Sequence, residues 1–133
     1  MSTTHYAPSR SAASSERYVR GLADERGVAV TCDVPGGPGA FSRRAEALAA
    51  ANDREVEALH YRQSFDAAEF DPDSAEGVQR VNDLGYQLGK RMHPHADALV
   101  VTHTDGRGRK PHNHILITNH DNETGRALSD YRT

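Results

Sequence analysis

Three histidines near the end of the chain have the residue type and spacing of a metal site. His112 and His114 lie two residues apart at the start of one apolar, β-prone run, and His103 lies near the end of another. Successive residues of a strand point to opposite faces, so His112 and His114 share a face and can bind one ion together. Three imidazoles leave coordination positions open, which is typical of a catalytic metal site.

The segment between the two runs determines whether His103 can reach the other two histidines. Residues 106–111 form a short connection with two glycines and a proline, as a β-hairpin requires. Such a hairpin would place His103 beside His112 and His114. The pattern therefore predicts a three-histidine site on one face of a hairpin.

The His-x-His pair has two other interpretations. A lone pair of this kind is more often structural than metal-binding. A cupin-like site also uses His-x-His but expects a glutamate a few residues later, whereas the first glutamate after His114 is Glu123. The remaining histidines need no ligand role; they are His5, His60, His93, His95 and His120.

The composition limits the class of protein. The chain has 133 residues, enough for one domain with a buried core, and 36% of them are hydrophobic. Its single cysteine, Cys32, excludes an internal disulfide and fits a reducing cytoplasm. The N-terminus is polar and no long apolar segment is present. We therefore expect a cytoplasmic domain without membrane insertion.

The charge of the chain is unevenly distributed. A net charge of −3 argues against strong non-specific DNA binding by the surface as a whole. Basic residues nevertheless lie beside the histidines and around Tyr18, while acidic residues collect in residues 66–76. A basic face with an acidic back is one interpretation, and an ordinary solvated surface is the other.

Hydrophobic periodicity and capping residues predict the elements that position the site. Helices are expected over 11–26, 41–59 and 71–91, the first capped by Ser14 or Ser15 and stopped by Gly27. Strands are expected over 28–34, 59–65, 98–104 and 112–119. This order predicts an α+β fold with an antiparallel β-sheet of about five strands. Helices would pack on one face of the sheet, and the histidines would lie on the other, solvent-facing one.

Several short strings along this order resemble one family. They are residues 60–65 (HYRQSF), 101–105 (VTHTD), 111–115 (PHNHI) and 122–126 (NETGR). Together they are similar to the relaxase/mobilisation nucleases of plasmids and integrative elements, the P-type branch of the HUH (His-hydrophobic-His) endonucleases. The resemblance runs from about Tyr18 to the end of the chain. It implies that residues 1–133 form a single HUH endonuclease-like catalytic domain, either a minimal relaxase or the truncated N-terminal part of a longer protein.

The resemblance also implies an activity. Enzymes of this family cut one DNA strand at an origin of transfer and form a reversible 5′-phosphotyrosine adduct, which serves conjugative mobilisation. On this resemblance Tyr18 is the nucleophile and Asp105 orients or activates the site. A divalent ion, Mg²⁺ or Mn²⁺, would be held by His103, His112 and His114. Tyr6 is the next candidate nucleophile, because it lies upstream of the first predicted strand and could reach the same face.

The expected partner is single-stranded or hairpin DNA at an origin of transfer, with accessory relaxosome proteins. The resemblance implies that Ser64 contacts DNA near the nick. The basic side chains expected to contact phosphates are Arg17, Arg20, Arg107, Arg109 and Lys110. Two other classes stay open: a metal-binding module that recognises single-stranded or hairpin DNA without cutting it, and a three-histidine enzyme acting on a substrate other than nucleic acid.

Overall fold

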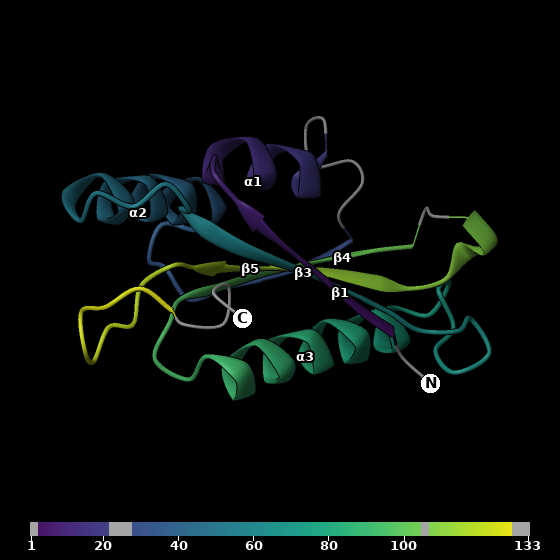
Figure 1. Ribbon diagram of the computed structural model, residues 1–133. Coiled ribbons are helices and arrows are strands. Elements are labelled where there is room, and N and C mark those ends of the chain that lie inside the picture. Colours follow the sequence, from purple (N-terminus) through teal and green to yellow (C-terminus); the bar gives the residue numbers. More distant parts are fainter. Residues whose placement is uncertain (1–2, 22–27, 105–106, 129–133) are drawn as a thin grey trace.

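A five-stranded antiparallel sheet with helices on both faces forms the fold (Figure 1). A computed structural model describes residues 3–21, 28–104 and 107–128. In chain order the elements are β1 (Thr3–Ser9), α1 (Ala12–Arg20), β2 (Ala29–Cys32), α2 (Pro38–Ala51), β3 (Ala58–Ser64), α3 (Ala75–Met92), β4 (Ala98–His103), the 3₁₀ turn η2 (Arg107–Arg109) and β5 (His112–Thr118).

The strand order places the expected hairpin in the middle of the sheet. The strands lie in the order β1-β3-β5-β4-β2, and each pairs antiparallel with its neighbours. Every residue of β4 and β5 is buried, because both strands are central in the sheet and helices cover both of its faces. The α+β class and the five-stranded antiparallel sheet are thus confirmed.

The prediction that helices pack on one face only was wrong. Figure 1 shows α1 and α2 on one side of the sheet and α3 on the other. On the first side, Leu99, Val101 and Leu116 pack with Val19 of α1 and Phe41 of α2. The physical reason lies in β4 and β5, whose central residues are apolar at consecutive positions instead of alternating, so both faces of these strands must be covered.

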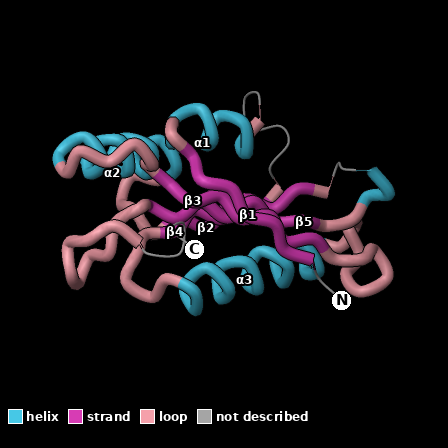
Figure 2. The backbone as a smooth tube through the Cα atoms, in the orientation of Figure 1, coloured by secondary structure: helices cyan, strands magenta, loops and turns pink. Residues whose placement is uncertain are grey.

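Helix α3 covers the opposite face (Figure 2). Val100, Ile115 and Ile117 lie in a cluster against which Tyr86 and Leu88 of α3 pack. The isoleucines of β5 therefore face α3, away from the histidines. In the described ranges no helix combines the length and apolarity needed to span a membrane.

The limits of α1 differ from the sequence prediction. Its N-cap is Ser11, whose Oγ accepts a hydrogen bond from the Ser14 N–H (3.2 Å), so neither Ser14 nor Ser15 is the cap. The helix ends at Arg20 because Gly21 adopts a φ of 74°. The proposed stop, Gly27, lies outside the described residues.

Two further differences concern α2 and β1. Helix α2 begins at Pro38 and ends at Ala51, well before residue 59, and Asp53 beyond it has a left-handed φ of 56°. Strand β1 was not predicted from the sequence. It lies at the edge of the sheet, six of its seven residues are exposed and it contains Pro8. An exposed edge strand has no buried face to impose an alternating hydrophobic pattern, and it tolerates proline.

Candidate metal centre

The pairing of β4 with β5 brings the three histidines together. His103 is directly opposite His112, and Val101 is opposite His114. One potential ligand atom from each histidine lies within 4.8 Å of the other two. Within the described part of the chain, this is the group of histidine, cysteine and carboxylate side chains close enough to hold one ion. The hairpin argument from the sequence therefore predicted the cluster correctly.

The cluster is buried, contrary to the expectation of a solvent-facing surface. His103, His112 and His114 are 0%, 4% and 3% exposed, because α1 and its neighbours cover this face of the sheet. Burial lowers the pKa of His114 to about 2, and the adjacent imidazoles and Arg62 add to this effect. Burial disfavours the charged form, so His114 is neutral near pH 7. A neutral imidazole is the form that binds a metal ion.

The hydrogen bonds of two histidines leave one ring nitrogen of each for the cluster. His112 Nδ1 donates to the backbone carbonyl of Lys110 (3.1 Å). His114 Nδ1 lies 2.9 Å from Nε2 of His60, on the neighbouring strand β3. Because Nδ1 is hydrogen-bonded in both rings, Nε2 is the nitrogen of each ring that would bind an ion. Three imidazole nitrogens this close together could hold one divalent cation, and three ligands leave coordination positions for substrate oxygens.

Helix α1 lies directly beside the cluster. The ring of Tyr18 meets the ring of His114 edge to face, with centroids 5.7 Å apart and an interplanar angle of 86°. The backbone carbonyl of Val19, the next residue, accepts a hydrogen bond from His103 Nε2. Tyr18 is nevertheless 57% exposed. The expected nucleophile therefore lies against a proposed ligand and remains open to a substrate.

The second candidate nucleophile lies elsewhere. Tyr6 is paired with Tyr61, and the two rings are 5.1 Å apart. Tyr61 belongs to the cluster beneath α3, so Tyr6 is on the face of the sheet opposite the histidines. The suggestion that Tyr6 could reach the same face as the metal site was wrong, because β1 is a regular strand and its alternation fixes the side of each residue.

The other residues expected to contact DNA differ in their exposure and in their ion pairs. Ser64 is opposite His112 in the sheet and is partly exposed. Arg17 is exposed on α1, whereas Arg20 forms an ion pair with the buried Glu16 (3.6 Å). Asp105 lies outside the described residues.

The basic turn before β5 is held by acidic side chains. Arg109 pairs with Asp73 (2.8 Å), and Lys110 lies 3.9 Å from Asp66. The side chain of Arg107 lies outside what the structure describes. Both acids belong to the acidic segment 66–76. Because they pair with the basic turn, the interpretation of a basic face with an acidic back does not hold for this segment.

Sequence reasoning missed two residues beside the cluster, His60 and Arg62. Arg62 is opposite His114 in the sheet and is exposed, and His60 bonds to the same histidine. The signal was present: the period-two alternation of β3 puts both residues on the same face as Ser64, which the sequence analysis had assigned to that site.

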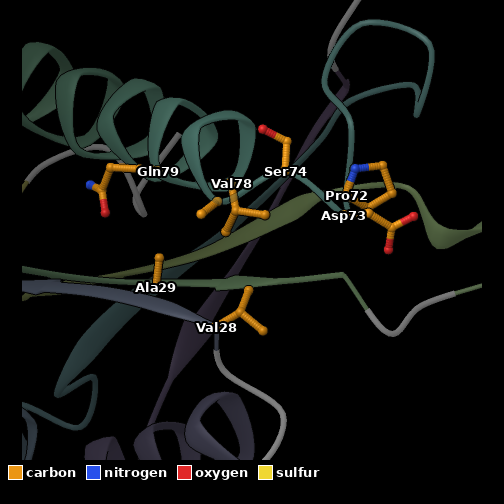
Figure 3. Close-up of a pocket in the computed structure, with 8 residues that line it drawn as sticks. Val28, Ala29, Pro72, Asp73, Ser74, Val78 and Gln79 are labelled. Atoms are coloured by element: carbon orange, nitrogen blue, oxygen red, sulfur yellow. The ribbon is translucent and has the colours of Figure 1, made fainter.

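The structure also has a pocket away from the histidines. A cavity of about 420 Å³ lies between Val28 and Ala29 at β2 and the first turn of α3 (Figure 3). Among its lining residues, all of them described, the ionisable one is Asp73, whose carboxylate pairs with Arg109. It offers no set of ligands or proton donors comparable with the histidine cluster.

Comparisons with known proteins agree with the geometry. The family model described as "Relaxase: MobA/VirD2-like, nuclease domain" matches residues 18–133. A curated relative named Protein rlx from Staphylococcus aureus is 32% identical over 126 residues, which are 95% of this chain and 36% of the relative. A second Protein rlx of the same organism is 28% identical over 130 residues, covering 98% of this chain and 36% of that protein. The chain spans about a third of the length of these relatives. With the family match, the histidine cluster and the antiparallel sheet in agreement, the chain belongs to the MobA/VirD2-like relaxase nuclease family.

Proposed function

We propose that this domain is a DNA relaxase that nicks one strand by attack of Tyr18 on a phosphodiester. The observation that carries the proposal is the contact between Tyr18 and His114. An exposed tyrosine lies against a cluster of three imidazoles that can hold one cation. Family membership supports the same reaction.

The proposed reaction conserves the energy of the phosphodiester. The Tyr18 oxygen bonds to phosphorus, the bond from phosphorus to the 3′ oxygen breaks, and the departing oxygen takes up a proton to become a free 3′ hydroxyl. The product is a 5′-phosphotyrosine, and the reverse attack by the 3′ hydroxyl reseals the strand.

His103, His112 and His114 would hold the divalent ion, Mg²⁺ or Mn²⁺. When bound, this ion would supply positive charge against the non-bridging oxygens of the scissile phosphate. Because the imidazoles are neutral, they leave that charge undiminished. Tyrosine has an unperturbed pKa of about 10, so loss of the phenol proton needs help near pH 7. We assign this help to Asp105 and to the positive charge that the bound ion would supply.

The proposed substrate is single-stranded or hairpin DNA at an origin of transfer, with accessory relaxosome proteins as further partners in conjugative mobilisation. We place the reaction in the cytoplasm. Ser64 and Arg17 are the expected DNA contacts best supported by the structure, since both are accessible at the cluster or on α1. We add Arg62, because it is exposed opposite His114. Arg20, Arg107, Arg109 and Lys110 remain proposed phosphate contacts.

Covalent trapping tests the proposal. Wild-type protein incubated with a labelled single-stranded origin oligonucleotide and Mn²⁺ should give a shifted band on a denaturing gel. Tyr18→Phe keeps the ring against His114 and removes the attacking oxygen, so it should bind DNA and Mn²⁺ but form no adduct.

The matched control is Tyr6→Phe, which removes the hydroxyl of an exposed tyrosine on the other face and should leave the adduct unchanged. An adduct in Tyr18→Phe would exclude Tyr18 as the nucleophile. DNA binding without an adduct in the wild type would favour a non-catalytic binding module, and binding of Mn²⁺ without DNA would favour an enzyme for another substrate.

A further inference from the structure

His60 lies outside the three-histidine cluster but is bonded to it. It belongs to β3, and its face of the strand is the histidine face of the sheet. Its Nε2 is 2.9 Å from Nδ1 of His114, and the two ring centroids are 5.1 Å apart. A residue that is hydrogen-bonded to the ring nitrogen that does not bind the metal controls the orientation of that ring.

The direction of this hydrogen bond follows from what the cluster requires. A neutral imidazole that offers Nε2 to a metal keeps its proton on Nδ1 and donates from there. His112 shows the same arrangement with an unambiguous partner, since its Nδ1 bonds to the Lys110 carbonyl, which can only accept. His114 must likewise donate from Nδ1, so Nε2 of His60 must accept.

We propose that His60 is a positioning residue for the metal centre: neutral and protonated on Nδ1, it accepts the Nδ1–H of His114 and so holds His114 Nε2 toward the ion. The proposal rests on the metal site of the proposed function. It predicts a defined proton position on two rings, one of them in a residue with no ligand role.

The choice of an imidazole as acceptor has a chemical consequence. Metal-binding histidines commonly donate to a carboxylate, a backbone carbonyl or water. A carboxylate behind His114 would add negative charge beside the site. Neutral His60 accepts the same hydrogen bond and carries no net charge, so a bound ion keeps its full positive charge for a phosphate.

Two substitutions of His60 separate its hydrogen bond from its bulk. His60→Leu keeps much of the volume but has no acceptor, whereas His60→Gln keeps an amide oxygen that can accept from His114. Calorimetric titration with Mn²⁺ alone should show affinity reduced about ten- to a hundredfold in His60→Leu, and largely restored in His60→Gln. His5→Gln, on the adjacent edge strand and the same face, is the matched control and should bind Mn²⁺ as the wild type does.

The nicking assay adds a second readout. Saturating Mn²⁺ should recover most of the nicking rate of His60→Leu, because the defect is in holding the ion. Equal Mn²⁺ affinity in His60→Leu and wild type would overturn the proposal, as would a Gln variant as weak as the Leu variant. If wild-type protein itself bound no Mn²⁺, the metal site of the proposed function would fail together with this inference.

Nuclear magnetic resonance of the wild type keeps the proposal testable if His60→Leu does not fold. Long-range ¹⁵N–¹H spectra of the Zn²⁺-loaded protein, a diamagnetic stand-in, should show a proton on Nδ1 of both His60 and His114. A proton on Nε2 of His60 would make that residue the donor and contradict the proposal.

Discussion

The two faces of β4 and β5 both bury polar side chains, and they differ in how those groups are satisfied. On the α3 face the polar groups form a closed network. Asn82 donates to Thr102 (3.0 Å), Thr102 donates to Asn113 (2.6 Å), and Asn113 donates to Gln63 (2.9 Å) and to the Val81 carbonyl (2.8 Å). Each group is paired with protein, so this network holds α3 to the sheet.

On the other face, the neighbours of Asn113 in sequence are His112 and His114. The Nδ1 atoms of these two rings are hydrogen-bonded to the Lys110 carbonyl and to His60. A ligand nitrogen of each ring lies close to a ligand nitrogen of His103. The hydrogen bonds of the Asn82–Thr102–Asn113 network stabilise the fold. The three histidine nitrogens, in contrast, lie close enough together to hold an added cation. Because successive residues of a strand point to opposite faces, Asn113 joins the network beneath α3 while His112 and His114 join the histidine cluster.

The largest expected effect comes from removing a ligand. Loss of a residue that is hydrogen-bonded to a metal ligand lowers metal affinity by up to about a hundredfold. His112→Ala removes a ligand itself, so it should lower Mn²⁺ affinity by more than that. Wild type at a hundred times its Kd should gain about 2.7 kcal/mol of stability from the ion, and the variant should gain almost none. Thermal unfolding with Mn²⁺ and with chelator measures this difference. If Mn²⁺ raised the Tm of the variant as much as that of the wild type, the histidine face would not be the metal-binding face.

Asn113→Ala should have the opposite profile. It leaves buried partners of the closed network unpaired, so the free energy of unfolding should fall by about 3 kcal/mol without added metal. The affinity of the folded protein for Mn²⁺ should stay within about threefold of wild type, since Asn113 points away from the cluster. Urea unfolding and calorimetry check the two halves. If metal affinity fell as far as in His112→Ala, the faces would not be separable.

Gly85→Ala should disturb the same network more mildly. An added Cβ would lie 2.5 Å from Asn113 Nδ2 and 3.0 Å from Val100 Cγ1, closer than atoms can pack. Overpacking of this kind should cost about 2 kcal/mol. Gly89→Ala, one turn along α3, would meet its nearest neighbour, Ile115 Cγ2, at 3.1 Å and should cost less.

A double-mutant cycle sharpens this prediction. In the background of Asn113→Ala, the side chain that Gly85→Ala would strike is gone, so the second substitution should cost less than it does alone. Strictly additive losses, measured by urea unfolding, would show that Gly85 and Asn113 are not packed against each other.

The smallest effect should come from the exposed cations at the edge of the histidine face. Arg62→Gln should weaken binding of every single-stranded oligonucleotide several-fold and lower the salt slope by about one. Arg109→Gln should do less, because the carboxylate of Asp73, 2.8 Å from Arg109, already offsets its charge toward a phosphate. Fluorescence titrations at several salt concentrations compare the two. A larger slope change in Arg109→Gln would return the main phosphate contact to the basic turn.

The sequence by itself determined the histidine cluster and the central hairpin. Two histidines two residues apart share a face in any strand, and a short glycine-containing connection brings the third opposite them, so local rules were sufficient. The cap of α3 at Ser74 and its apolar stripe were predictable for the same reason, since both depend on residues within a few positions of one another.

The residues around that cluster are brought there by tertiary packing, which local sequence patterns do not predict. The packing of α1 puts Tyr18 on His114, and the pairing of β3 with β5 puts His60 behind the same ring, across 96 and 54 positions of sequence. The edge strand β1, which places Tyr6 on the far face, has no hydrophobic pattern of its own. Helices on both faces turned an expected open surface into a buried site. Such contacts depend on which elements pack together, and that is set by the burial of whole faces rather than by the spacing of residues along the chain.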